Sequence, residues 1–151
     1  MSMDIEEQYD KIYRYCYFRL KEQQTAEDIT QETFLRFLEN KTYQNTGQTL
    51  QYLYTVARNL CIDEYRRKKC VELTEELGEE REDDWVLSIT VRQALAELQK
   101  EDQELLLLRY VNEVPVSVIG SVLGLSRFAV YRRTKDALKH LREKLGGEEV
   151  W

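Results

Sequence analysis

The sequence predicts an all-α protein in which an acidic linker joins two small helical domains. Only one proline and six glycines occur in 151 residues, and a protein rich in strands usually has more of these turn-forming residues. Apolar residues recur at intervals of three and four, as they do along one side of a helix. Residues 71–84 are too acidic to bury much surface. We expect domains over residues 1–70 and 88–145, a linker over 71–87 and a tail over 146–151.

The first domain is expected to contain three helices. The first spans residues 5–22, where the apolar positions at helical spacing are Ile5, Tyr9, Ile12, Tyr13, Cys16 and Leu20. Thr25 is the expected N-cap of a second helix over residues 26–39, whose acidic first turn suits the helix dipole. A polar loop over residues 40–49 leads to a third helix over residues 50–69. The third helix is expected to bury Leu53, Ala57, Leu60 and Cys61.

The second domain is expected to contain four helices, over residues 88–100, 102–112, 115–124 and 127–145. Pro115 suits the first turn of the third of these helices, and Gly120 leaves room for a close helix crossing. Gly124 then allows a tight turn, and Ser126 is the expected N-cap of the last helix. Two helices joined in this way form a helix-turn-helix, although a polar helical hairpin can imitate the pattern.

The last helix is expected to have a buried stripe and a basic face. The stripe consists of Val130, Thr134, Ala137, Leu138, Leu141 and Leu145. The opposite face consists of Phe128, Tyr131, Arg132, Lys135, Lys139 and Arg142, with Arg127 in the first turn and Arg133 beside the stripe. Such a helix lies in the major groove with its N-terminal residues at base edges. Arg127 and Arg132 suit guanine O6 and N7 there, whereas Arg133 and Lys135 suit phosphates.

Phe128 places an apolar ring on the side of this helix that is expected to be exposed. Contact with the methyl group of a thymine in the groove would explain the ring. The alternative is a ring that folds back onto the preceding helix.

Basic residues are concentrated in two segments, although the net charge of the chain is −6. Residues 58–70 hold five basic and two acidic side chains, and residues 105–145 hold eight and three. Between them, residues 71–104 hold three basic and twelve acidic side chains. Basic patches are typical of phosphate contacts, although each patch could also be a solvated helix face. The negative overall charge predicts that the free protein binds DNA weakly and that a partner assists this binding.

The first domain offers two further polar faces. On the second helix, Ala26, Ile29, Thr33 and Phe37 point to one side, and the other side holds Asp28, Gln31, Glu32 and Leu35. An acidic face with an exposed leucine suits docking on a basic helical partner, and a merely solvated face is the alternative. On the third helix, one stripe holds Tyr52, Thr55, Asn59, Asp63 and Arg66, and the preceding loop offers Asn40, Tyr43 and Asn45. Aromatic and amide groups beside basic residues suit unstacked bases, although tyrosines at helical spacing usually belong to a core.

Several classes of function are disfavoured. His140 is the only histidine in the sequence, and Cys16, Cys61 and Cys70 form no CxxC pair. The sequence also lacks a glycine-rich phosphate loop, so we expect no catalytic residue, metal or cofactor. The N-terminus lacks an apolar run and no stretch reaches the length of a membrane span, which favours a cytoplasmic protein with reduced cysteines.

Two parts of the chain resemble a known family. The segments "AEDITQETFLRFLEN" and "QYLYTVARNLCIDEYRRKK" are similar to region 2 of bacterial RNA polymerase sigma factors. The segment "ALAELQKEDQELLLLRYVNEVPVSVIGSVLGLSRFAVYRRTKDALKHLREKL" resembles region 4. The resemblance covers residues 5–145, and it is closest to the small extracytoplasmic-function (ECF) group, sigma-70 family group IV, which keeps only these two regions. It implies a non-enzymatic factor that binds core RNA polymerase, recognises the −10 and −35 promoter elements and directs transcription initiation.

The resemblance also implies roles for individual residues. Docking on the clamp helices of the polymerase β′ subunit is implied for Asp28, Gln31, Glu32 and Leu35. Contact with the −10 element is implied for Tyr43, Asn45, Arg58, Asn59, Arg66 and Arg67. Contact with the −35 element is implied for Ser126, Arg127, Phe128, Tyr131, Arg132, Arg133 and Lys135. The acidic linker would thread toward the RNA exit channel of the polymerase.

The implied partners are core polymerase, through its β′ clamp helices and β flap, promoter DNA and an anti-sigma factor. No small-molecule substrate and no membrane insertion are expected.

Some residues depart from the common family pattern: Tyr52 replaces a frequent tryptophan, and Arg127 and Phe128 stand where small or acidic residues are frequent. The segment "VSVIGSVLG" also lacks a frequent acidic residue, so the −35 sequence stays open.

Two other functions compete with this interpretation. A stand-alone helix-turn-helix regulator would leave the polar face of helix 26–39 and the "ARN" motif unexplained. A helical adaptor that binds no DNA would leave the basic face of the last helix without a role.

Overall fold

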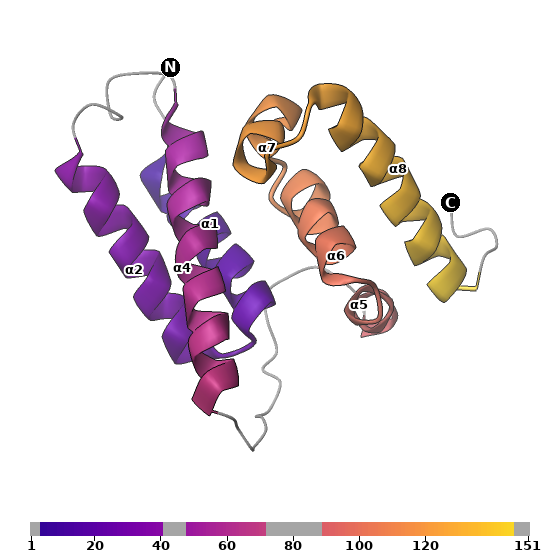
Figure 1. The fold of residues 1–151 in the computed structure, drawn as a ribbon, viewed down its shortest axis with the longest axis horizontal. Helices are drawn as coiled ribbons and strands as arrows, with labels where there is room; N and C mark the ends of the chain where they lie inside the picture. The colour runs from indigo at the N-terminus through magenta and orange to yellow at the C-terminus, as the bar shows by residue number, and fades with distance from the viewer. Residues whose placement is uncertain (1–3, 41–47, 72–88, 147–151) are drawn as a thin grey trace. The chain divides into compact units, whose positions relative to one another are not determined.

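The computed structural model describes residues 4–40, 48–71 and 89–146 of the chain, and every regular element within these ranges is helical (Figure 1). The predicted all-α class is therefore confirmed. The chain forms two compact units, Met1–Glu79 and Glu80–Trp151. The predicted acidic linker and tail lie almost entirely outside the described residues, as do Tyr43 and Asn45. In the part of the chain that is described, no helix is long and apolar enough to span a membrane.

The first unit is a bundle of α1 (Ile5–Leu20), α2 (Gln23–Glu39) and α4 (Thr49–Val71), and each helix packs on the other two (Figure 1). The Asp4 side chain caps α1 by accepting a hydrogen bond from the Glu7 N–H, over 3.3 Å. Helix α1 ends at Leu20 because Lys21 adopts a left-handed conformation, with φ of 59°. The helix is thus two residues shorter than the sequence predicts.

The core of the first unit contains most of the apolar residues predicted to be buried and a pair of tyrosines. Ile12, Cys16, Ala26, Leu53, Ala57 and Cys61 are fully buried. Tyr15 and Tyr54 are 1% exposed and meet edge to face, with ring centroids 5.8 Å apart. The sequence prediction missed both tyrosines, and Leu60, which it expected to be buried, is only half-buried.

The predicted N-cap of the second helix is wrong. Helix α2 begins at Gln23, and Glu22 occupies the N-cap position in an extended conformation. Thr25 lies inside the first turn, where its hydroxyl donates a hydrogen bond to the Glu22 carboxylate. Because the chain reverses at Lys21, the helix starts before Thr25 and leaves its hydroxyl free to bind Glu22 rather than a backbone N–H.

The second unit consists of α5 (Ile89–Ala96), α6 (Lys100–Leu106), the π-helical turn η1 (Leu107–Val111), α7 (Val116–Leu123) and α8 (Arg127–Lys144). The sequence predicts helices over 88–100 and 102–112, so α5 ends earlier than expected. The Gln103 side-chain amide explains this end, because it donates to the carbonyls of Ala96 and Leu98 over 3.2 and 2.8 Å. A side chain thus satisfies carbonyls that a continuing helix would otherwise bind.

Four consecutive leucines form the centre of the second unit. Leu105, Leu106, Leu107 and Leu108 are each at most 4% exposed. Four successive helical positions point around most of the helix circumference, so their burial needs neighbours on several sides. Helices α7 and α8 supply these neighbours. The helix widens into η1 here, where the Asn112 N–H donates to the Leu107 carbonyl over 2.9 Å.

Helices α7 and α8 form the predicted helix-turn-helix. Gly124 ends α7 in a left-handed conformation with φ of 72°, and Ser126 Oγ caps α8 by accepting from the Ala129 N–H over 3.0 Å. Pro115 is the N-cap of α7 rather than a first-turn residue, because its ψ of 145° is extended. The predicted buried stripe of α8 is confirmed for Val130, Thr134, Ala137 and Leu141, whereas Leu138 and Leu145 are half-buried.

Gly120 allows the close turn between the two helices. A Cβ atom at this position would lie 2.6 Å from the Leu125 carbonyl oxygen and 3.7 Å from Val130 Cγ2. The Leu125 N–H also donates to the Gly120 carbonyl over 2.8 Å. The nearest obstacle is therefore backbone of the turn, which cannot rotate away as a side chain would.

Gly120→Ala is expected to lower the free energy of unfolding of the second unit by about 1–2 kcal/mol, because the steric overlap outweighs the better helix propensity of alanine. Thermal unfolding followed by circular dichroism measures the loss, and amide hydrogen exchange in α7 and α8 assigns it to this unit. Ser121→Ala, at the exposed neighbouring position, is the control. Equal or greater stability of Gly120→Ala would contradict the close approach.

Candidate nucleic-acid and protein interfaces

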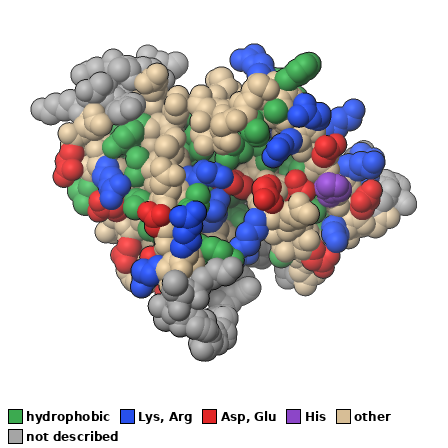
Figure 2. All heavy atoms as spheres, viewed as in Figure 1, with side chains coloured by type: hydrophobic (Ala, Val, Ile, Leu, Met, Phe, Trp, Pro, Cys, Tyr) green, Lys and Arg blue, Asp and Glu red, His purple; other side chains and the backbone are tan. Residues whose placement is uncertain are grey.

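The N-terminal end of α8 carries a basic surface. The exposed residues there are Arg127, Phe128, Tyr131, Arg132, Arg133 and Lys135. Figure 2 shows Lys and Arg side chains gathered over this end of α8, with a hydrophobic side chain among them. Residues 126–135 include four basic and no acidic side chains. Such a concentration of positive charge suits the phosphates of a nucleic acid.

Phe128 and Ser126 occupy different positions at this surface. Phe128 is 76% exposed, so the alternative in which its ring folds back onto α7 is wrong. Tyr131, one turn further along α8, is 49% exposed. Ser126 is also exposed, but its hydroxyl oxygen already accepts the capping hydrogen bond from Ala129. The cap orders the first turn of α8, from which the basic and aromatic side chains project.

Helix α2 presents the predicted polar face. Its inner side packs in the core, where Ala26, Ile29, Thr33 and Phe37 are buried as predicted. On the outer side Asp28, Gln31 and Leu35 are exposed and Glu32 is half-buried. Glu32 binds Arg36 over 2.9 Å, and Asp28 accepts a hydrogen bond from the Gln24 amide over 3.1 Å. The structure therefore brings the four predicted docking residues onto one accessible face.

Leu38 belongs to the same face, and the sequence prediction missed it. Leu38 is 59% exposed and Leu35 is 54% exposed, and three residues separate them on α2. Residues three apart are neighbours on a helix surface. Extending the stripe one more turn from Leu35 would have identified Leu38 as a second apolar contact.

Helix α4 presents Asn59, Arg66 and Arg67 on its exposed side, while Arg58 is half-buried. Asn59 and Arg66 are seven residues apart and therefore lie on one side of the helix. Tyr52, on the same stripe, donates its hydroxyl to the Arg36 carbonyl over 3.3 Å and packs against Phe37. Tyr52 thus joins α4 to α2, in accord with the tendency of such tyrosines to belong to a core.

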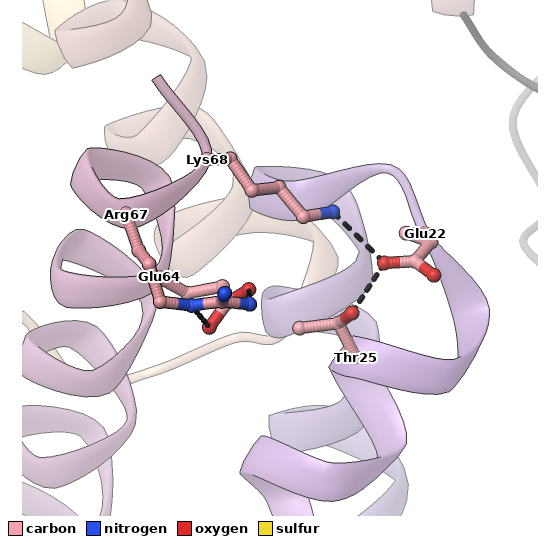
Figure 3. A network of polar contacts seen from close by, with 5 residues as sticks. All are labelled: Glu22, Thr25, Glu64, Arg67 and Lys68. Carbon is pink, nitrogen blue, oxygen red and sulfur yellow. Dashed lines mark hydrogen bonds and ion pairs between the residues drawn. The ribbon is translucent and has the colours of Figure 1, made fainter. Parts of the chain in front are cut away.

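Two carboxylates bind the basic C-terminal end of α4. Figure 3 shows Arg67 directed along the helix to Glu64, and Lys68 reaching Glu22 at the start of α2. Arg67 binds Glu64 through two nitrogens, Nη2 over 2.6 Å and Nε over 3.3 Å. Lys68 Nζ lies 2.9 Å from Glu22 Oε1. Part of the positive charge of this segment is therefore balanced within the unit.

These contacts shift the pKa values of the Arg67 and Glu22 side chains. Hydrogen bonding to Glu64 raises the pKa of the Arg67 guanidinium. The hydrogen bond from Thr25, followed by that from Lys68, lowers the pKa of Glu22 below 4.5. The Glu22 carboxylate is thus stabilised in its charged form, between a hydroxyl on α2 and an ammonium on α4.

Cysteine and histidine side chains are the remaining candidate groups. Among the described residues, no group of three His, Cys, Asp or Glu side chains could hold a metal ion. Cys16 and Cys61 are buried cysteines outside any disulfide, and the side chain of Cys70 lies outside the described part. His140 Nδ1 lies 3.0 Å from Asp102 Oδ2 and so connects α8 to α6.

Glu22→Gln is expected to lower the free energy of unfolding by roughly 0.2–1 kcal/mol near pH 7, the usual range for an exposed ion pair. Because folding depresses the pKa of Glu22, its contribution is present above pH 4.5 and disappears as the pH falls through the lower folded value. Denaturant unfolding between pH 3 and pH 7 would show the two proteins converging at the acidic end. Glu27→Gln, which alters an exposed carboxylate of the same helix, is the control, and a pH-independent difference would contradict the assignment.

Comparisons with known proteins match both units of the chain to one family. The family Sigma-70 region 2 matches residues 5–70, and the family Sigma-70, region 4 matches residues 94–143. The ECF RNA polymerase sigma factor SigW of Bacillus subtilis is 32% identical over 90% of this chain and 83% of SigW. The ECF RNA polymerase sigma factor BldN of Streptomyces coelicolor is also 32% identical over 90% of this chain, but the match spans 56% of BldN.

A solved structure shares the fold. It is the sigma factor RpoE of Bartonella quintana in complex with the anti-sigma factor NepR. The TM-score is 0.73 over 93% of each chain, with 15% sequence identity. With the two family regions in order and a 32% identical relative matched over most of its length, the chain belongs to the ECF RNA polymerase sigma factors.

Proposed function

We propose that this sigma factor uses three surfaces: one that docks on core RNA polymerase and two that contact promoter DNA. Core docking and −10 contacts belong to residues 1–70, and −35 contacts belong to residues 88–145, with the acidic segment 71–87 between them. The observation that carries this proposal is the presence of two different faces in one chain. Helix α2 exposes an acidic face with two leucines, and α8 exposes a basic face with two aromatic rings. A stand-alone regulator needs only the second.

The face of α2 is proposed to bind the clamp helices of the β′ subunit. The contributing residues are Asp28, Gln31, Glu32 and Leu35, and Leu38 extends the apolar part. Two exposed leucines surrounded by polar side chains fit the apolar core and polar rim of a protein interface. The acidic groups around them favour a basic helical partner.

The exposed side of α4 and the preceding loop are proposed to engage the −10 element. Tyr43, Asn45 and Asn59 would receive unstacked bases, and Arg58, Arg66 and Arg67 would contact the backbone. The exposure of Arg66 supports its proposed contact with the DNA backbone. Arg67 must exchange its bond to Glu64 for a phosphate, so it is the weaker phosphate contact of the two.

The N-terminal end of α8 is proposed to read the −35 element in the major groove. Its residues are Ser126, Arg127, Phe128, Tyr131, Arg132, Arg133 and Lys135. Arg127 and Arg132 suit base edges, and Arg133 and Lys135 suit phosphates. The same unit is proposed to contact the β flap of the polymerase.

The distribution of charge explains why the chain works with the polymerase rather than alone. With a net charge of −6, the free protein is repelled by DNA at long range, while core polymerase supplies nonspecific affinity. Action in the cytoplasm, no enzymatic activity and no small-molecule substrate follow from this role. RpoE of Bartonella quintana was solved with the anti-sigma factor NepR. We propose that this chain also has an anti-sigma factor and that it covers the polymerase-binding surfaces of the chain.

Run-off transcription with purified core polymerase on fragmented genomic DNA of the source organism tests the proposal. Discrete transcripts that require the chain are expected, and their upstream sequences would define the −10 and −35 elements. If no transcript appears and the chain also fails to capture core polymerase, the stand-alone regulator becomes the better interpretation. Tight, salt-resistant binding of the free protein to promoter duplex would refute the argument from net charge.

Arg132→Ala is expected to reduce initiation from −35-dependent promoters roughly 5- to 150-fold, the cost of losing one good base contact. Capture of core polymerase should be unchanged, because Arg132 belongs to the face of α8 proposed to contact DNA and the α2 docking face lies in the other unit. Multiple-round transcription and a core pull-down give the two measurements. Lys139→Ala removes one exposed charge nearer the end of α8 and is expected to have a much smaller effect.

Gln31→Ala combined with Leu35→Ala is expected to weaken core binding about tenfold or more, because both side chains lie at the centre of the docking face. Competition with the wild-type chain for a limiting amount of core polymerase measures the change. The double variant Glu6→Ala and Asp10→Ala, on the exposed side of α1, is the control. Unchanged competition by the first variant would show that α2 is not the docking helix.

A further inference from the structure

Phe128 is the most exposed large hydrophobic residue in the part of the chain that the structure describes. Its exposed fraction is 76%, and the values for the other large hydrophobic residues on the surface are 40–59%. Helix register explains the exposure, because Val130 and Thr134 turn the opposite side of α8 into the core. The ring therefore cannot reach the core without rotating the whole helix.

The first turn of α8 defines the helix position from which the ring projects. Ser126 caps this turn, and Phe128 is the second residue of the helix. Tyr131 and Arg132 follow at intervals of three and four, so they are the neighbours of the ring on the helix surface. Any group that contacts Phe128 therefore lies against the N-terminal end of α8. In a recognition helix, this end points at the edges of the bases.

The surroundings of the ring identify the chemistry of its partner. Residues 126–135 contain four basic side chains and no acidic one, so a polyanion is favoured over an ordinary apolar protein surface. Inside the major groove, the base edges offer hydrogen-bonding groups and a single kind of apolar group, the 5-methyl group of thymine. Aromatic carbon packs favourably on this methyl group, whereas it would leave the polar edges of the other bases desolvated.

We propose that Phe128 packs on the 5-methyl group of one thymine in the −35 element, which makes Phe128 a specificity-determining residue of this sigma factor. This inference rests on the proposed function of α8 and adds the chemical group that is recognised. The arginines beside it supply hydrogen bonds and charge, and Phe128 discriminates by apolar contact alone. The promoters of this factor therefore share a thymine at the position that faces the start of α8.

Replacing single thymines by deoxyuridine removes the methyl group and leaves every hydrogen-bonding group in place. Each thymine on either strand of the −35 element of an identified promoter is replaced in turn, and open-complex formation is measured with the full chain and core polymerase. One position should respond, with about a fourfold loss for the wild-type chain, since burying one apolar carbon contributes about 0.8 kcal/mol. For Phe128→Ala, thymine and deoxyuridine should be equivalent at that position.

Arg132→Ala is the matched control, because it should lower initiation on both templates and keep the fourfold ratio between them. Circular dichroism and core capture of Phe128→Ala should match the wild type, since the ring is largely exposed. The inference is overturned if no thymine responds, if the ratio persists in Phe128→Ala, or if Phe128→Ala loses core binding instead. If Arg132→Ala also leaves −35-dependent initiation unchanged, the proposed role of α8 fails as well, so the two failures are distinguishable.

Discussion

The close approach of Gly120 to the turn before α8 is the constraint on which the basic face of α8 depends. With 2.6 Å between a Cβ at this position and the Leu125 carbonyl oxygen, only glycine lets α7 meet the turn. Gly124 reverses the chain, and the Ser126 cap starts α8 at a defined residue. Once this start is set, the 3.6-residue period directs Val130 inward and Phe128 outward. This register determines which side chains lie on the basic face.

In the first unit, too, the packing of buried residues determines which surfaces are exposed. Tyr15 and Tyr54 meet edge to face at the centre of the bundle, so two large rings set how α1 and α4 pack. Thr30 and Thr33 are also buried, and neither hydroxyl is left unpaired, because each donates to a backbone carbonyl of the preceding turn. The polar faces of α2 and α4 are the surfaces that this packing leaves exposed.

Electrostatics distinguish the two basic segments. At the end of α4, Glu64 and Glu22 bind Arg67 and Lys68, so part of the positive charge is already balanced before any DNA is present. At the start of α8 no acidic residue lies between residues 126 and 135. The second segment therefore presents a stronger field to phosphates, although the net charge of the whole chain is negative.

Local chemistry was sufficient to predict the helical class, the buried stripe of α8, the Gly124 turn and the Ser126 cap, because each depends on residues within one or two turns. The exposed residues of α2 and α8 followed from the same periodicity. Contacts between distant segments needed the folded chain: Glu22 binds Lys68 across 46 residues, and Tyr15 meets Tyr54. The start of α2 before Thr25 and the pairing of Arg67 with Glu64 also depend on where each side chain finds its partner. Periodicity specifies the face on which a residue lies, whereas its partner is set by the helices that pack around it.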